Sequence, residues 1–395
     1  MKILYFAPVY YDDMKQRPQQ IAECLALKHD VYYVEPTVSL LRWLLRGGRS
    51  FMGIKKRLYN GLKVIRLNGC LTFHKSMEIL DLCGINSWYE LWQLRKLIKE
   101  CDLVWVGYSG WYTIVRHIKT KPVIFDKMDE EDMLVSSSIW KLTLRRNQKK
   151  LFQMSDAVMV TCQQFYDRYK DKKKKVFLIP NAVSDRFASG ITLQDTCFKK
   201  LHKIKTFGYI GTIGEWFDVD VIDKILKMDD RYEVYLVGRN YLPRIDNLRV
   251  HYLGIRKNKE LSKIIQTFDV CLYNFKQSPI LDTINPVKIY EYLSLNKPVL
   301  AVSSKETLRL RKYLEIYENV DKIETIIRNG LKPPFTDIKS LQQFIKENSW
   351  VARTEQIEQI LREEIRNYEK GDVSLWNKAR SSKDVSSCKR DGKTS

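Results

Sequence analysis

The feature that most constrains the fold is an alternation of short apolar runs, rich in β-branched and aromatic residues, with segments of helical periodicity. In the first half of the chain, KILYFAP, DLVWVGY, KPVIFD and DAVMVTC alternate with helical segments such as RPQQIAECLALK. Continuous apolar runs of this length are typical of parallel strands buried on both faces. Their alternation with helices predicts a doubly wound α/β domain.

The alternation stops at a polar, turn-rich segment and then starts again. KTFGYIG, EVYLVG, FDVCLYNF and KPVLAV form the second series of strand-like runs. The sequence therefore predicts an α/β protein of two doubly wound Rossmann-like domains that face a cleft. The predicted parts are an N-terminal domain of residues 1–185, a linker of 186–203, a C-terminal domain of 204–348, a helix of 349–370 and a disordered tail of 371–395.

Several classes of protein are disfavoured by simple patterns. No apolar run approaches the roughly 20 residues of a membrane-spanning helix. The short apolar run at the start meets Asp12 and Asp13, so we interpret it as a first strand rather than a targeting segment and expect a cytoplasmic protein. The eight cysteines and five histidines are scattered without metal-binding spacing, so neither a metal site nor a disulfide framework is expected.

The charge balance indicates an anionic partner. The chain has 68 Lys and Arg residues against 47 Asp and Glu residues, a formal net charge of +21. Nucleic acid, an anionic membrane face and phosphorylated substrates are the candidates that such an excess favours. No recognised nucleic-acid-binding motif supports the first of these, so we expect no nucleic-acid partner.

The glycine pattern separates the two domains. The first strand–helix turn, FAPVYYDDMKQRP, contains no glycine, which disfavours a dinucleotide fingerprint there. The equivalent turn of the second domain, FGYIGTIGEWFDVDVI, contains Gly211 and Gly214. Backbone N–H groups at such a turn can bind an anion, although glycine also occurs in ordinary turns of this kind.

The stretch NPVKIYEYLSLNKPVLAV predicts a helix followed by a strand, with Asn285 as the N-cap and Pro286 at the first helical position. Lys288 then opposes the positive end of the helix dipole unless an anion lies there. Alternatively, Lys288 reaches solvent or pairs with Glu291 three residues on. Glu291 suits a neighbouring diol such as the ribose hydroxyls, which donate hydrogen bonds to a carboxylate.

The order of these segments resembles that of GT-B glycosyltransferases related to glycosyltransferase family 4. The second half resembles their nucleotide-sugar domain through FGYIGTIGEWFDVDVI, YEVYLVG, VHYLGIRKNKELSKIIQTFDVCLYNF and NPVKIYEYLSLNKPVLAV. The first half resembles their acceptor domain through RPQQIAECLALKHDVYYVEP, KPVIFDKMDEEDML and SDAVMVTCQQFYDRY. The resemblance covers residues 1 to about 365 and implies sugar transfer from a nucleoside diphosphate sugar, with UDP as the expected nucleotide.

The resemblance implies roles for residues of the predicted helix. Glu291 matches the glutamate that binds the donor ribose. Lys288, with Asn285 and Pro286, matches the segment that binds the diphosphate. Thr283 stands where many relatives carry a second glutamate that contacts the donor sugar. The sugar contact and the stereochemical outcome therefore stay open.

The remaining donor residues implied by the resemblance lie in three loops. Gly211 and Thr212 match the loop that faces the donor phosphates, while Gly254 and Arg256 match the loop that borders the nucleobase. The Arg/Lys pair that many relatives carry after the YIG glycine is missing here. We therefore expect Lys288, backbone dipoles and Arg239 to stabilise the leaving diphosphate. Fixed donors and cations can do this without a metal ion, so metal-independent transfer with no cofactor is expected.

On the acceptor side, polar residues follow two of the predicted strands. Asp12, Asp13 and Arg17 come after the first, and Asp126 and Asp129 come at the end of another. Any of them could hold acceptor hydroxyls, and Asp129 is our first choice of catalytic base, beside Lys288 on the donor side. The alternative is a set of solvated loop carboxylates.

The basic charge is concentrated in SLLRWLLRGGRSFMGIKKRLYNGLK, where aromatic and aliphatic residues mix with arginine and lysine, and KLTLRRNQKK adds to it. This composition favours an anionic membrane surface, although an ordinary helix with a solvated basic side has the same composition. Together with the resemblance it implies a peripheral enzyme at the inner face of the cell membrane. Such an enzyme would extend a lipid-linked cell-wall polysaccharide such as teichuronic acid. A non-catalytic basic binding protein and a sugar-nucleotide epimerase are the alternatives.

Overall fold

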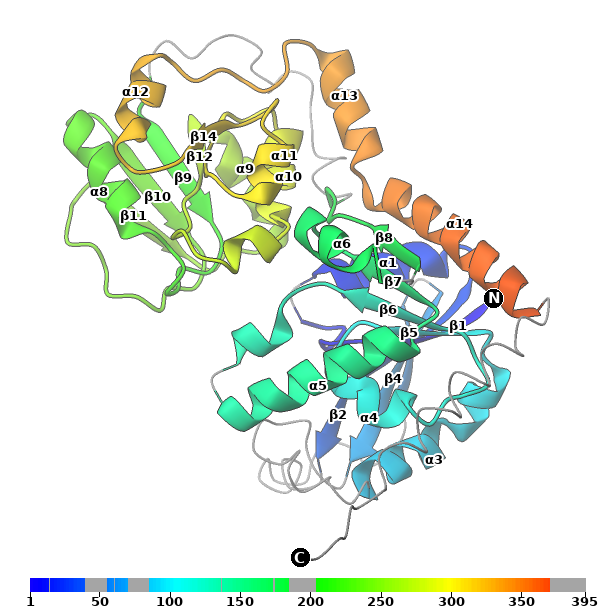
Figure 1. Ribbon diagram of the computed structural model, residues 1–395. Coiled ribbons are helices and arrows are strands. Elements are labelled where there is room, and N and C mark those ends of the chain that lie inside the picture. Colours follow the sequence, from blue (N-terminus) through cyan, green and yellow to red (C-terminus); the bar gives the residue numbers. More distant parts are fainter. Residues whose placement is uncertain are drawn as a thin grey trace, which may run out of the picture.

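The computed structural model describes residues 1–13, 15–39, 55–59, 61–69, 85–135, 137–172, 175–184 and 204–369. The chain forms two α/β domains that meet across an interface, with a long C-terminal helix lying against the first (Figure 1). The predicted linker of 186–203 and the predicted tail of 371–395 lie outside the described residues.

The N-terminal domain is an eight-stranded sheet in the order β3-β4-β2-β1-β5-β6-β7-β8. Neighbouring strands are parallel except for β3, which runs antiparallel to β4 at the edge. The strands are β1 (Lys2–Phe6), β2 (Asp30–Ser39), β3 (Lys55–Tyr59), β4 (Leu62–Gly69), β5 (Leu103–Val106), β6 (Val123–Lys127), β7 (Ala157–Val160) and β8 (Lys175–Leu178). The helices are α1 (Arg17–Ala26), α3 (Ile85–Glu100), η2 (Ser109–Trp111), α4 (Tyr112–Val115), η3 (Glu131–Leu134), α5 (Ser138–Met154) and α6 (Gln163–Tyr169).

The C-terminal domain is a six-stranded, entirely parallel sheet in the order β11-β10-β9-β12-β13-β14. Its strands are β9 (Thr206–Ile210), β10 (Glu233–Val237), β11 (Val250–Gly254), β12 (Val270–Tyr273), β13 (Val299–Val302) and β14 (Glu315–Tyr317). Its helices are α8 (Val219–Met228), α9 (Asn258–Gln266), η5 (Leu281–Thr283), α10 (Val287–Ser294), α11 (Lys305–Arg309), α12 (Lys322–Arg328) and α13 (Ile338–Glu347). The prediction of two doubly wound Rossmann-like domains is confirmed.

The apolar runs become strands because both faces of each sheet are covered. Along β1, Ile3 and Tyr5 belong to the apolar core on one face of the sheet, while Leu4 and Phe6 belong to the core on the other. Successive side chains of a strand point to opposite faces, so a strand covered on both sides must be apolar throughout. This explains why the sequence shows continuous apolar runs instead of alternation.

The last helix, α14 (Trp350–Glu369), returns to the N-terminal domain after the C-terminal domain is complete. It packs beside α1 (Figure 1), and its residues Trp350, Ile357 and Leu361 belong to the N-terminal core. At the crossing, the Val183 N–H donates to the Asn348 carbonyl at 2.7 Å, so the departing and returning segments lie side by side. The chain therefore crosses between the two domains twice, in these two neighbouring segments.

Candidate functional site

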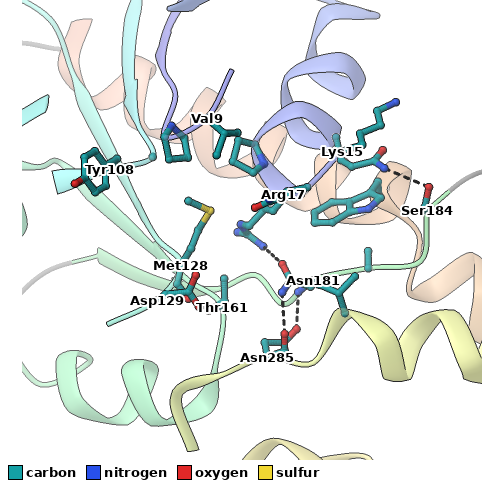
Figure 2. A pocket seen from close by; sticks show the side chains of 18 of the residues that line it. Val9, Lys15, Arg17, Tyr108, Met128, Asp129, Thr161, Asn181, Ser184 and Asn285 are labelled. Carbon is teal, nitrogen blue, oxygen red and sulfur yellow. Dashed lines mark hydrogen bonds between the residues drawn. The ribbon is translucent and has the colours of Figure 1, made fainter. Parts of the chain in front are cut away.

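A cavity of about 600 Å³ lies between the domains (Figure 2). The segments that follow β1, β5, β6, β7 and β8 form its N-terminal walls, and the start of α10 forms the opposite wall. The carboxyl ends of parallel strands are where open α/β sheets bind their ligands. Five of the residues singled out in the sequence line this cavity: Arg17, Asp129, Asn285, Lys288 and Glu291.

Arg17 and Asp126 form a buried ion pair beneath the cavity. Arg17 is 5% exposed and Asp126 is fully buried. The Arg17 guanidinium donates to both Asp126 oxygens, with nitrogen–oxygen distances of 2.9 to 3.2 Å, and to the Ile179 carbonyl at 2.8 Å. Arg17 still faces the cavity, whereas Asp126 does not line it. Asp126 therefore holds Arg17 in place and is not open to an acceptor.

The loop that follows β6 presents two carboxylates to the cavity, Asp129 and Glu131. The loop is fixed from both sides, because the Thr161 hydroxyl donates to the Met128 carbonyl at 2.6 Å and the Lys127 ammonium donates to the Asp129 carbonyl at 3.1 Å. Asp129 is exposed to the cavity, yet the surrounding walls desolvate its carboxyl and raise its pKa, against the lowering influence of Lys127.

Glu131 is the more strongly perturbed of the two carboxylates. Desolvation raises its pKa to about 7, although hydrogen bonds from Ser109 lower it. The Ser109 N–H lies 3.2 Å and 3.1 Å from the two carboxylate oxygens, and the Ser109 hydroxyl donates to Oε2. Glu131 was not among the residues predicted from the sequence, because it stands in an acidic run where composition alone does not distinguish one carboxylate from the next.

On the opposite wall, Lys288 and Glu291 pair within α10, with Nζ 2.8 Å from Oε2. This is the alternative that the three-residue spacing allowed. Glu291 is nearly buried, whereas Lys288 is about one-third exposed to the cavity. A ligand anion can replace the carboxylate as the partner of Lys288 without moving the helix, because the two groups lie on the same helical face.

The prediction that Asn285 caps α10 is wrong. The helix begins at Val287 with Pro286 at the N-cap position, and no side chain caps it. The Asn285 side chain instead accepts a hydrogen bond from the Asn181 N–H at 2.9 Å (Figure 2), and it donates to Glu306. These are partners from distant parts of the chain, which a local capping rule cannot anticipate. No described side chain therefore competes with a ligand for the backbone donors at the start of α10, of which the Ile289 N–H already donates to the Pro286 carbonyl at 3.1 Å.

Five of the other predicted donor residues lie at the carboxyl ends of β9, β10 and β11, and they do not line the cavity. Gly211 and Thr212 follow β9, while Arg239, Gly254 and Arg256 are at or beyond the ends of β10 and β11. The Ile210 N–H donates to the Tyr292 hydroxyl at 2.9 Å, which fixes the end of β9 against α10. These residues therefore share the sheet edge with α10.

One glycine missed in the sequence shapes this edge. Gly238 has a φ of +139°, and a Cβ there would lie 2.0 Å from the Gly211 carbonyl oxygen. Only glycine permits this backbone approach between the loops after β9 and β10. The remaining predicted residues lie elsewhere: Asp12 and Asp13 are exposed between β1 and α1, and Thr283 is buried, with its hydroxyl 2.7 Å from the Ile280 carbonyl.

Among the described residues, no three His, Cys, Asp or Glu side chains gather so that they could hold a metal ion. The one D-x-D triplet in the sequence, Asp218 to Asp220, begins α8, where the Asp218 carboxylate caps the helix by accepting from the Asp220 N–H at 3.1 Å. Metal independence stays a prediction. Within the same described ranges, no helix is long and apolar enough to cross a membrane.

Comparison with known proteins was made for both sequence and structure. No protein-family model matches the chain. A curated relative, TuaH of Bacillus subtilis (strain 168), bears the provisional name of teichuronic acid biosynthesis glycosyltransferase. It is 23% identical over 245 residues, which span 56% of this chain and 60% of the relative.

Solved structures match nearly the whole chain. Sucrose-phosphate synthase from Thermosynechococcus elongatus has a TM-score of 0.62 at 13% identity and covers 92% of this chain and 98% of its own. HepE from Anabaena in complex with UDP-glucose has a TM-score of 0.59 at 14% identity, with 92% and 100% covered. A UDP-forming trehalose-phosphate synthase from Burkholderia vietnamiensis has a TM-score of 0.64 at 10% identity, with 93% and 99% covered. The chain therefore has the GT-B fold.

Proposed function

We propose that this GT-B chain is a glycosyltransferase that moves a sugar from a UDP-sugar to a growing, lipid-linked cell-wall polysaccharide such as teichuronic acid. The observation that carries the proposal is the cavity between the domains, with Lys288, Glu291 and an uncapped helix start on one wall and two carboxylates on the other. The names of the curated relative and of the UDP-bound structural neighbours support the same class of reaction.

The donor nucleotide lies along α10 in this proposal. The positive end of the helix and Lys288 hold the diphosphate, while Glu291 accepts hydrogen bonds from the ribose hydroxyls. Binding separates Lys288 from Glu291, and each then meets a group of the ligand that complements it. As the bond between the sugar and the diphosphate breaks, negative charge grows on the leaving phosphate, where Lys288 and the backbone N–H groups already point.

The acceptor hydroxyl approaches from the N-terminal domain. Its oxygen forms the new bond to the anomeric carbon, the bond from that carbon to the diphosphate oxygen breaks, and UDP leaves. The hydroxyl proton passes to a carboxylate in the cavity wall. A base is most effective when its pKa lies near the working pH. Glu131, with a pKa of about 7, therefore suits this role better than Asp129, the base that was predicted from the sequence. Asp129 then orients the acceptor beside it.

The donor site is tested by calorimetric titration of the full chain with UDP and UDP-sugars. Glu291→Ala is expected to weaken UDP binding at least tenfold, because it removes the acceptor of the ribose hydrogen bonds. The matched control is Glu318→Ala, which removes an exposed carboxylate from the same domain and leaves binding unchanged. UDP binding that is absent in the unaltered protein, or equal in Glu291→Ala, would contradict the proposed donor site.

Membrane attachment is proposed through the exposed face of α5. Ile139 and Leu142 are 57% and 66% exposed, and Arg145 and Arg146 follow them on the same face. Apolar side chains beside cations suit the surface of an anionic bilayer. The segment that the sequence first indicated, residues 39–63, lies outside the described residues except for Ser39, β3, Gly61 and the start of β4.

Sedimentation with vesicles tests this attachment. The protein is expected to sediment with vesicles rich in anionic lipid at low salt, and Ile139→Glu/Leu142→Glu is expected to lower the bound fraction severalfold. Trp88→Glu/Trp92→Glu is the matched control, because it charges two exposed apolar side chains on α3. Equal sedimentation of the two double variants would show that α5 is not the attachment surface.

A further inference from the structure

A second cavity, of about 730 Å³, lies on the other side of the loop after β6. Residues 127–133 separate it from the central cavity: Met128, Asp129 and Glu131 line the central cavity, while Lys127 and Glu130 line the second. The two cavities share no lining residue. Helices α5 and α6 contribute eight of its seventeen lining residues, and Pro279, Ile280 and Thr283 of the C-terminal domain line it as well.

The second cavity carries excess positive charge. Five cationic and two acidic side chains line it: Lys127, Arg145, Lys149, Arg168 and Lys172, with Glu130 and Asp132. Both carboxylates already form ion pairs. Glu130 pairs with Lys127 and Arg168, and Asp132 pairs with Arg145. Lys149 and Lys172 are exposed and form no ion pair within the described part of the chain.

Aromatic and amide groups accompany this charge. The rings of Phe152 and Tyr169 pack with centroids 4.6 Å apart, and the Lys172 ammonium lies 5.3 Å from the Tyr169 ring. Two amide atoms in the wall, Nε2 of Gln148 and Oε1 of Gln164, are buried and have no hydrogen-bond partner among the residues that the structure describes. Because buried polar atoms are usually paired, these two atoms are candidates to pair with a ligand in the cavity.

The volume suits a small ligand or one end of a chain, because ligand pockets are typically about 300–1,000 Å³. The lysines without an ion-pair partner favour a negatively charged group on the ligand. The aromatic rings can pack against the apolar face of a sugar ring, and the amides can form hydrogen bonds with its hydroxyls. We propose that the second cavity binds an acidic sugar unit, carrying a carboxylate or a phosphate, of the acceptor polysaccharide. The assignment of that unit to the acceptor rests on the proposed function.

This placement connects the ligand to the reaction site. The loop that separates the cavities offers Lys127 and Glu130 to one side and Asp129 and Glu131 to the other. The Lys127 ammonium binds Glu130 at 3.0 Å and the Asp129 carbonyl at 3.1 Å, so the two sides are held by one side chain. An acidic unit in the second cavity would thereby fix the growing chain next to the carboxylates that receive its terminal hydroxyl.

Calorimetry on the full chain tests the proposal with three probes: a tetrasaccharide of glucuronic acid, glucose 6-phosphate and a neutral glucose tetrasaccharide. At least one acidic probe is expected to bind, and Lys149→Glu/Lys172→Glu is expected to weaken that binding about tenfold or more, because two attractions become repulsions. Whichever acidic probe binds identifies the carboxylate or the phosphate as the recognised group.

The control variant is Lys96→Glu/Lys227→Glu, which makes the same change of net charge at exposed positions outside the cavity. Acidic-sugar binding that survives in Lys149→Glu/Lys172→Glu, or that falls equally in the control, would overturn the proposal, and so would a lack of binding to either acidic probe. UDP titration of the same variants separates the two hypotheses. Loss of an acidic probe with unchanged UDP binding locates the ligand in the second cavity, whereas absent UDP binding in the unaltered protein rejects only the donor site.

Discussion

Glu131→Gln is expected to lower the rate of sugar transfer by about 10²- to 10⁴-fold, the usual contribution of a positioned general base. Glutamine keeps the size of the side chain and can still accept a hydrogen bond from Ser109, but it cannot take the proton of the acceptor. In the unaltered enzyme the rate should rise with pH through about 7, as the Glu131 carboxyl loses its proton. This rise should disappear in Glu131→Gln. The measurement is the rate of UDP release at a series of pH values.

Asp129→Asn is the matched control, because it neutralises the neighbouring carboxylate in the same cavity. It is expected to weaken acceptor binding and to keep the rise near pH 7. A Glu131→Gln enzyme with the normal rate and pH profile would remove Glu131 from the mechanism. Loss of the rise in Asp129→Asn alone would return the role of base to Asp129, the residue that sequence analysis favoured.

The pH dependence of the free energy of unfolding gives a second, independent measure of the Glu131 pKa. The pKa of Glu131 in the folded state is raised from the ordinary 4.5 to about 7, so the folded protein holds this proton more tightly than the unfolded chain does. The resulting stabilisation is complete below pH 4.5 and is lost as the pH rises to 7. Glu131→Gln has no such proton to lose. In urea unfolding it should therefore gain stability relative to the unaltered protein between pH 4.5 and 8.

Arg17→Met is expected to lower the free energy of unfolding by about 3–5 kcal/mol, because it leaves the buried Asp126 carboxylate without a partner. It also removes the donor to the Ile179 carbonyl. Arg17→Met/Asp126→Asn should recover much of this loss, since neither residue then leaves a buried charge. Urea unfolding followed by fluorescence measures both variants.

Lys63→Met is the control for this pair. It breaks an ion pair with Asp30 that has a similar nitrogen–oxygen distance, 2.6 Å, but lies at the surface. Exposed pairs contribute about 1 kcal/mol or less. If Arg17→Met lowered the free energy of unfolding no more than Lys63→Met does, the buried ion pair would not be a determinant of stability. Its position beneath the cavity would then need another explanation.

The fold could be predicted because its cause is local. A strand buried on both faces must be apolar throughout, as β1 shows with Ile3, Leu4, Tyr5 and Phe6, and such runs are visible in the sequence. The helix that the structure shows at 287–294 was also predicted from residues that are close to one another in the sequence. The pairing of Lys288 with Glu291 could be anticipated because a spacing of three residues places two side chains on one face of a helix.

The remaining features depend on partners that are distant in sequence. Arg17 and Asp126 are 109 residues apart, and Asn285 is 104 residues from Asn181, so no short pattern relates them. Asn285 therefore looked like a helix cap. Glu131 was missed because its pKa depends on Ser109 and on the walls of the cavity, whereas its neighbours in the acidic run share its composition and differ in their surroundings.

The return of α14 to the N-terminal domain affects the order in which the protein can fold during synthesis. Trp350, Ile357 and Leu361 belong to one face of the N-terminal core, although they are made after the whole C-terminal domain. The N-terminal strands and α1 leave the ribosome before α14, which covers that face together with α1. The C-terminal sheet, by contrast, is contiguous from β9 to β14. The domain that is synthesised second can therefore complete its core first, in reverse of the usual order of folding along a chain.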